Sequence, residues 1–462
     1  MKVNHWTHRW LSFAGRVQLI KSVVQALPIY RCMLQVAPMG FLKDLDSVVR
    51  QFLWAGCLQS SKWSLVRWEV VCSPKQYGGL GLRQSALIGE ALAAKLYWWW
   101  YNEQDKSWAK IISHKYLPEI SPIDISRYPL VGKGSSLWDT LKKGANLIKD
   151  GLFWICKKGE AAQFWSDSWD GYPPLTSQFP NLGLLCQQFQ EAGWSRVRDF
   201  KTFYFCGHLE MAKWKPPEEW PVSGSQEECD VLHNILSSRR CCSLQEDDVL
   251  AWSPNPKGIY TVAYGYSRLM SHKLVGPEMQ WWKKVWNKLS WPKCSCFVWM
   301  LAWNKCLTWD NIRKRGFLGP SICVMCGANE EDSAHLFFRC SFAMQLWHFW
   351  WGVWNTLCVH ASSLIEFWQG MGRPPSVAPF LQELWLVGPI FLLWQIWLER
   401  NRRIFHGEQR LVQQIWLRVL GMVQETVAAK CDVDFPLEKN DAELFERLGI
   451  LGPSRASAKD KR

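Results

Sequence analysis

The sequence lacks the segments that direct a chain into or across a membrane. Its first six residues are polar and aromatic, and no apolar stretch of signal-peptide length follows them. The longest apolar run, from Leu384 to Leu398, is interrupted by Pro389 and Gln395. Such a run is too short to span a bilayer comfortably, so it predicts a buried helix. We therefore expect an intracellular protein of the nucleus or cytoplasm, without a membrane partner.

The cysteines do not form an even, closely spaced set of the kind found in secreted disulfide scaffolds. There are 17 of them, scattered from Cys32 to Cys431. An odd number at irregular spacing, in a chain with no secretory signal, is typical of free thiols and thiolate-bound metal in a reducing compartment.

Acidic residues are scarce relative to basic ones: 41 Asp and Glu face 54 Lys and Arg, for a formal net charge of +13. An excess of this sign favours a polyanionic partner, although it indicates neither a fold nor a reaction. Tryptophan is abundant, with 33 residues. We expect most of these rings in hydrophobic cores, because many recur at helical spacing, and any exposed ones could stack on bases.

The glycine cluster from Gly78 to Leu82 is not a phosphate-binding loop, because no Gly-Lys-Ser/Thr follows it. We expect it to form a turn at which two backbone segments approach closely. Asp247 and Asp248 form the only Asp-Asp pair, and they are expected to be a solvated entrance to a strand. Asp167, between aromatic residues, is expected to form a turn.

One local pattern does carry chemistry. Cys323, Cys326, His335 and Cys340 form a C-x2-C-x8-H-x4-C set. Paired thiolates can hold one side of a tetrahedral ion while a later His and Cys close the other, which predicts one structural Zn²⁺ with no open position for water. The alternative is a group of buried free thiols beside an unrelated histidine.

Hydrophobic periodicity predicts a mainly α-helical, multi-domain protein with a small β-hairpin. The hairpin is expected at Val249–Trp252 and Ile259–Val262, and Thr308 is expected to N-cap a helix that ends near Gly316. The other predicted helices cover residues 11–27, 41–54, 86–100, 280–289, 293–303, 342–357 and 381–405.

The sequence suggests five segments. Residues 1–105 form a helical part; residues 106–235 are an irregular Trp-rich region; residues 236–350 hold the hairpin, helices and metal site; residues 351–430 are helical; and residues 431–462 form a polar tail. The last ten residues are small and charged, which predicts disorder.

Several motifs in order resemble the C-terminal part of plant LINE-type, or non-LTR, retrotransposon polyproteins, including their reverse-transcriptase zinc-binding domain. The resemblance extends from about residue 6 to residue 406. It rests on Trp10-Leu-Ser-Phe-Ala-Gly-Arg16 with Leu19-Ile-Lys21, Phe52-Leu-Trp54-Ala-Gly56, Pro74-Lys75 before Gly78-Gly-Leu-Gly-Leu82, Phe164-Trp165-Ser-Asp167-Ser-Trp169, Gly258-Ile-Tyr260-Thr-Val262, Trp291-Pro292-Lys293, the quartet with His335-Leu-Phe-Phe338, and Trp397-Leu-Glu399-Arg400-Asn401.

The resemblance implies that residues 1–100 correspond to the region just after a polymerase palm, so that the helical part over residues 1–105 would be a thumb-like remnant of a reverse transcriptase. Polymerase chemistry requires carboxylates that hold two Mg²⁺ ions, and the family's aromatic-x-Asp-Asp hairpin would lie before residue 1. We therefore expect no catalytic residues and no enzyme activity in this chain, which looks like a truncated element whose family activity is RNA-directed DNA polymerase.

The sequence is compatible with three functions. The first is non-sequence-specific binding of RNA, DNA or both by the zinc module and nearby cations. The second is participation in an active polymerase, joined to upstream reverse transcriptase domains. The third is a zinc-stabilised protein-protein scaffold. The cations expected to contact nucleic acid are Arg313, Lys314, Arg315, Arg339, Arg400, Arg402 and Arg403.

Overall fold

The computed structural model describes residues 11–26, 29, 37–56, 62–120, 128–206, 209–222, 226–239, 247–253, 255, 257–274, 278, 281–372, 378–429 and 439–450. The chain divides into two compact units, each assembled from separate segments. Unit 1 contains residues 1–25, 44–84 and 274–462, and unit 2 contains residues 26–43 and 85–273. These units do not follow the five segments suggested by the sequence, because residues 1–105 contribute to both. The expected disordered tail lies outside the described residues.

Unit 1 is helical and contains the Cys3His residues. Helix α3 (Met39–Ala55) enters it at residue 44. Its other elements are α1 (Phe13–Leu19), η3 (Ile20–Val24), α4 (Trp68–Cys72), η4 (Lys75–Tyr77), α12 (Trp282–Val285), α13 (Pro292–Ala302), α14 (Trp309–Arg313), η8 (His335–Arg339), α15 (Ser341–Trp354), α16 (Leu364–Gly370), α17 (Pro379–His406), α18 (Val412–Ala428) and α19 (Lys439–Arg447).

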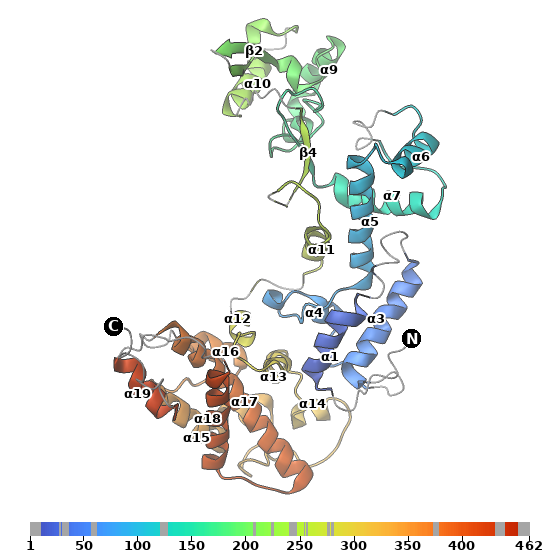
Figure 1. Ribbon diagram of the computed structural model, residues 1–462. Coiled ribbons are helices and arrows are strands. Elements are labelled where there is room, and N and C mark those ends of the chain that lie inside the picture. The colour runs from blue at the N-terminus through green and yellow to red at the C-terminus, as the bar shows by residue number, and fades with distance from the viewer. Residues whose placement is uncertain are drawn as a thin grey trace, which may run out of the picture. The chain divides into compact units, whose positions relative to one another are not determined.

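The core of the C-terminal part of unit 1 forms around α17, which packs against α13, α15 and α18 (Figure 1). Gly388 in α17 lies against the Trp350 ring of α15 so closely that a Cβ atom would sit 2.0 Å from a ring carbon. Within the described residues, α17 alone is long and apolar enough to cross a membrane, yet 67% of its apolar window is buried inside the protein. This burial agrees with the core helix predicted there.

The glycine cluster is a close backbone approach, as predicted. Gly78 has a left-handed φ of 79°, and its carbonyl oxygen accepts indole N–H bonds from Trp299 at 2.7 Å and Trp303 at 2.9 Å. A Cβ atom on Gly79 would lie 1.8 Å from the carbonyl oxygen of Ser73. The cluster thus joins the N-terminal segment of unit 1 to α13, and only glycine fits this geometry.

Unit 2 is mixed. Helices α5 and α7 pack closely, because Gly144 of α7 allows contact with the backbone of Ala93 in α5. The elements of the unit are α5 (Ser85–Asn102), α6 (Ser107–Tyr116), α7 (Ser136–Lys149), β1 (Leu152–Ile155), α8 (Leu175–Gln178), η5 (Pro180–Leu182), α9 (Gly183–Glu191), η6 (Val197–Phe200), β2 (Lys201–Cys206), β3 (Leu209–Trp214), η7 (Pro217–Glu219), α10 (Gln226–Ser238), β4 (Val249–Trp252) and α11 (Val262–Ser271).

Most elements of the described residues are helices and the strands form only two small antiparallel sheets, so the mainly α-helical fold class is confirmed. The position predicted for the hairpin, at Val249–Trp252 and Ile259–Val262, is wrong. Strand β4 pairs with β1, with Leu152 opposite Trp252, and the second sheet joins β2 to β3. Residues 259–261 form no strand. Tyr260 is buried and donates its hydroxyl to the carbonyl of Ala91, while Thr261 caps α11 through a bond from the N–H of Tyr264.

Residues 106–235 contain more regular structure than their sequence indicates. Their short helices and strands surround a core in which the Phe164 and Phe200 rings stack with centres 3.6 Å apart. Asp167 accepts the backbone N–H of Gln163 at 2.8 Å and so closes a turn, in agreement with its predicted role. The elements from β1 to η7 are too short to produce a periodic signal, whereas α7 and α10 are helices that sequence reasoning missed.

Five predicted helices are found close to their expected bounds, namely α3, α5, α13, α15 and α17. The helix expected over residues 280–289 is shorter, since α12 ends at Val285. Asn287 accounts for this end, because its side-chain oxygen accepts the N–H of Leu289 at 2.7 Å and forms a turn instead. Of the helix expected over residues 11–27, residues 13–24 are helical and change from α1 to the π-helical η3 at Ile20.

Candidate metal centre and the basic residues around it

The four predicted ligands lie together. The Sγ atoms of Cys323, Cys326 and Cys340 and a ring nitrogen of His335 all lie within 4.8 Å of one another. The Cys323 and Cys340 sulfurs are 4.0 Å apart, and the Cys326 sulfur lies 3.3 Å from His335 Nε2. Ligand bonds of the usual zinc lengths give a tetrahedron with edges of about 3.6–3.8 Å. The donor set therefore fits a four-coordinate metal ion.

A tight turn presents the first two ligands. The N–H of Gly327 bonds to the carbonyl of Cys323 at 2.8 Å, and Gly327 has a left-handed φ of 67°. The N–H of Cys323 bonds back to Asn329 at 2.7 Å. The hydrogen bond with the Cys340 sulfur and burial raise the pKa of Cys323, while the backbone N–H groups of Cys326 and Met325 point at its sulfur and act in the opposite direction.

The other two ligands lie at helix starts. His335 begins η8, and its backbone N–H bonds to the carboxylate of Asp332 at 2.6 Å. Cys340 is the N-cap of α15, where the N–H groups of Phe342 and Ala343 point at its sulfur. The Cys323 thiol and these two N–H groups lower the pKa of Cys340, so Cys340 is the first of the pair to ionise. Burial lowers the pKa of His335 and favours the neutral, ligating imidazole.

A buried ion pair lies beside the metal centre. Glu331 in the loop before His335 accepts Arg400 Nη2 at 2.6 Å and Arg400 Nε at 3.1 Å, and both side chains are at most 5% exposed. Glu331 also accepts the backbone N–H of Trp309 at 3.0 Å. This carboxylate therefore connects α17, α14 and the metal loop.

Arg402 and Arg403 are also paired within the protein. Both lie against Glu399, at 3.6 Å for Arg402 Nε and 2.9 Å for Arg403 Nε, and Arg403 also donates to the carbonyl of Met325 at 3.0 Å. Arg403 thus attaches α17 to the turn between the first two cysteines. Arg339 is half-exposed and pairs with Asp332 at 3.3 Å.

The cluster Arg313, Lys314 and Arg315 is the most accessible of the predicted cationic groups. Arg313 and Lys314 are exposed, and Lys314 pairs with Asp310 at 3.2 Å. The Arg315 guanidinium lies over Trp63, 4.9 Å from the ring centre. The Phe317 ring meets Trp63 edge-on at 5.7 Å, and both rings are at least half exposed.

Sequence reasoning missed Glu331, Glu399 and Trp63. The Glu399-Arg400 and Arg402-Arg403 neighbours in one helix are a signal of local pairing, since residues three and four apart share a helix face. Nothing in the sequence near Trp63 indicates its exposure.

The Asp-Asp pair belongs to unit 2 and holds a loop. Asp248 accepts backbone N–H groups from Lys157, Gly159 and Ala161 at 2.7–2.8 Å. Asp247 is largely exposed and pairs with Lys158 at 2.9 Å. Asp247 is the solvated residue expected at the start of β4, whereas Asp248 anchors the loop that follows β1.

Comparison with known proteins agrees with this geometry. Residues 260–347 match the family described as zinc-binding in reverse transcriptase, a range that includes all four Cys3His residues. The chain is 26% identical over 361 residues to a putative ribonuclease H protein of Arabidopsis thaliana, an alignment that covers 75% of this chain and 53% of that protein. It is 28% identical over 146 residues to an uncharacterized mitochondrial protein of the same plant, and this alignment covers 31% of this chain and 92% of that protein.

These comparisons support a relation to reverse transcriptases of plant retroelements, and residues 260–347 carry the zinc-binding domain of that kind. The chain spans about half the length of the first relative.

Proposed function

We propose that the Cys3His centre holds one structural zinc ion and that the protein binds RNA or DNA without sequence preference through the surface next to it. The observation that carries the proposal is a group of exposed side chains, Arg313, Lys314, Trp63 and Phe317, together with the half-buried Arg315, whose guanidinium lies over Trp63. Cations neutralise phosphates, and exposed rings offer a stacking face for unpaired bases.

The remaining predicted cations contribute less to this proposal. Arg400 is buried against Glu331, and Arg403 is buried against Glu399, so binding phosphate would require breaking these pairs. Arg339 and Arg402 are accessible in part but paired. We therefore place the binding surface at Arg313–Arg315 and Trp63, and give Arg400 and Arg403 a structural role.

The proposal includes a LINE-type origin and a chain that carries no polymerase palm of its own. The ordered run of motifs in the sequence supports the origin, and the use of Asp248 as a loop anchor supports the lack of a metal-binding carboxylate pair in the described residues. Joined to upstream reverse transcriptase domains, the same surface would serve an active RNA-directed DNA polymerase by holding template or product.

A salt titration tests the proposal. The full chain is titrated with single-stranded RNA and with duplex DNA at several salt concentrations, and affinity is expected to fall steeply with salt on both. Replacing Arg313, Lys314 and Arg315 with Ala should reduce the magnitude of the log-log salt slope by up to about 3 without loss of metal. Identical slopes would place the binding surface elsewhere.

A second pair of variants tests the stacking face. Trp63→Ala should weaken binding to single strands by about 1–3 kcal/mol and leave duplex binding nearly unchanged. Leu318→Ala is the matched control, because Leu318 is a neighbouring side chain that is 94% exposed and has no ring. Absence of any binding at low salt would instead favour the protein-protein scaffold.

A further inference from the structure

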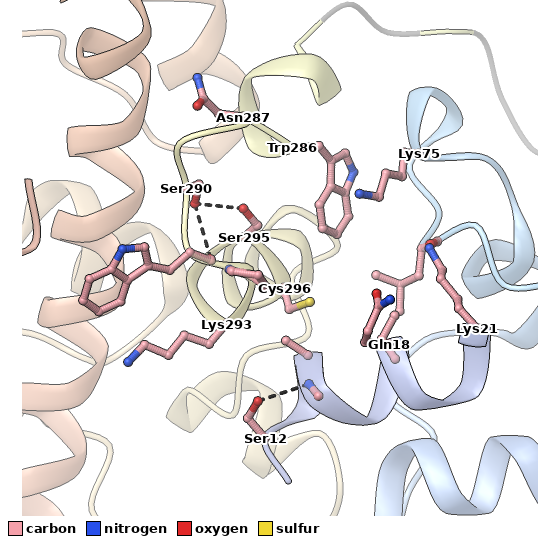
Figure 2. A pocket seen from close by; sticks show the side chains of 16 residues that line it. Ser12, Gln18, Lys21, Lys75, Trp286, Asn287, Ser290, Lys293, Ser295 and Cys296 are labelled. Carbon is pink, nitrogen blue, oxygen red and sulfur yellow. Dashed lines mark hydrogen bonds between the residues drawn. The ribbon is translucent and has the colours of Figure 1, made fainter. Parts of the chain in front are cut away.

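A pocket of about 630 Å³ lies in unit 1, away from the four Cys3His residues. Figure 2 shows the residues that line it: one wall comes from α1, η3 and η4, and the other from the segment after α12 and the first turns of α13. Both walls belong to the same compact unit. The pocket is therefore formed where the N-terminal segment packs against the start of the zinc-binding domain.

Positive charge dominates the lining. Lys21, Lys75 and Lys293 all line the pocket, and its lining contains neither Asp nor Glu. Within the described part of the chain, no ion pair involves any of the three lysines. The only thiol in the lining, Cys296, stays neutral at physiological pH because burial raises its pKa to about 12. The charge of the lysines is thus not offset locally.

The side chains of Lys21 and Lys75 line the same pocket. Burial lowers the pKa of Lys21, and the positive charge of Lys75 lowers it further. Lys21 Nζ donates to the carbonyl of Leu80 at 2.5 Å, which holds the side chain in place. An anion between the two lysines would offset their repulsion and raise the pKa of Lys21 back toward its usual value.

The pocket also offers neutral donors. The Trp286 ring lies 4.5 Å from Lys75 Nζ, and its indole N–H is buried with no acceptor among the described residues. Gln18 and Ser290 line the same space. Figure 2 shows Lys75 beside Trp286, facing Gln18 and Lys21. A buried donor without an acceptor is costly, and an anionic oxygen would satisfy it.

We propose that this pocket binds a phosphate ester, held by Lys21 and Lys75 with Trp286 as a further donor. The phosphate can belong to the backbone of a nucleic acid strand or to a free nucleotide, and the chemistry of the contacts is the same. Lys293 lies on the opposite wall, where its Nζ is 4.7 Å from the centre of the Trp291 ring, and Figure 2 shows it pointing away from Lys21 and Lys75. The proposal shares no residue with the surface at Arg313–Arg315, so the two can fail separately.

Amine labelling of the full-length, metal-loaded chain tests the proposal without a mutation. The protein is acetylated briefly at low salt with no addition, with pyrophosphate, with a deoxynucleoside triphosphate, or with a single-stranded DNA 12-mer, and modified lysines are quantified by mass spectrometry. We expect at least threefold slower modification of Lys21 and Lys75 in the presence of a phosphate ligand. Lys305 is exposed, lies outside the pocket, and should be unaffected.

The arms of the experiment distinguish the two sources of phosphate. Protection by pyrophosphate and triphosphate assigns the pocket to free phosphate groups, whereas protection by the 12-mer alone assigns it to a strand backbone. Equal labelling with and without every ligand would overturn the proposal. The protection should persist when Arg313, Lys314 and Arg315 are replaced with Ala, which separates this pocket from the surface proposed above.

A charge reversal provides the second readout. Lys75→Glu places a carboxylate in the pocket and should weaken binding of the protecting ligand at least tenfold, while Lys305→Glu should not exceed a twofold change. Metal content and thermal midpoint measured on both variants confirm folding. Equal affinity of the two folded variants would contradict the assignment.

Discussion

Arg400 of α17 and Glu331 of the metal loop form an ion pair inside unit 1, with Nη2 2.6 Å from Oε1 and both side chains almost fully buried. Glu331 also holds the backbone of Trp309 at the start of α14. The pair therefore fixes the metal loop against two helices. The sequence context of Arg400 predicts that it contacts nucleic acid, but in the structure Arg400 positions the loop that carries the Cys3His residues.

Removal of one partner of this pair should destabilise the protein. Arg400→Met leaves the Glu331 carboxylate buried without its counter-charge, which typically costs about 3–5 kcal/mol. The double variant Arg400→Met with Glu331→Gln should recover part of this loss, because no uncompensated charge remains. Chemical denaturation followed by circular dichroism measures both. Unchanged stability of the single variant would show that the pair is not formed in solution.

Loss of one metal ligand should unfold the module around it. Cys326→Ala removes a thiolate, and structural zinc sites supply on the order of 10 kcal/mol of apparent folding free energy. Zinc content should fall from one ion per chain to none, and residues ~280–350 should become sensitive to limited proteolysis. Cys358→Ala is the matched control, since Cys358 is also half-buried and is no ligand. In the unaltered protein, X-ray absorption should show Zn–S distances near 2.3 Å.

Gly78→Ala should destabilise unit 1 by about 1–3 kcal/mol. Its φ of 79° is unfavourable for alanine, and the added Cβ would lie 2.6 Å from the Trp282 ring. Gly421→Ala serves as the control, because Gly421 lies inside α18 with open space around it and should gain up to about 1 kcal/mol in helix propensity. The thermal midpoint should therefore fall for Gly78→Ala and rise for Gly421→Ala.

The isolated chain should not incorporate nucleotides on a primed RNA template, because two-metal chemistry needs carboxylates free to bind Mg²⁺. Asp248 is engaged by three backbone N–H groups, and Asp247 pairs with Lys158. Replacing Asp248 with Ala should instead cost about 1–3 kcal/mol of stability, since those N–H groups lose their acceptor. Template-dependent synthesis that disappears on mutation of Asp247 and Asp248 would refute this prediction.

Much of the helical structure and the metal ligands follow from local spacing. The apolar residues of α3, α5, α13, α15 and α17 recur at helical spacing, because the side of each helix that packs against the core, or its entire surface, is buried. This spacing predicts the five helices. The Cys3His set is similarly local. Cys323 and Cys326 lie in one turn, and Cys340 caps a helix five residues after His335, so their spacing alone brings the four donors together.

Other features depend on contacts between distant segments. The partner of β4 is β1 and not the neighbouring residues 259–262, because Tyr260 is drawn into a core with Ala91. The exposure of Trp63 and the charge of the pocket at Lys21 and Lys75 arise only when separate segments pack. The sequence by itself determined the Cys3His cluster, the main helices and the excess of positive charge. The tertiary structure decided which cations remain free, because an arginine such as Arg400 is neutralised by a carboxylate that only folding brings into contact.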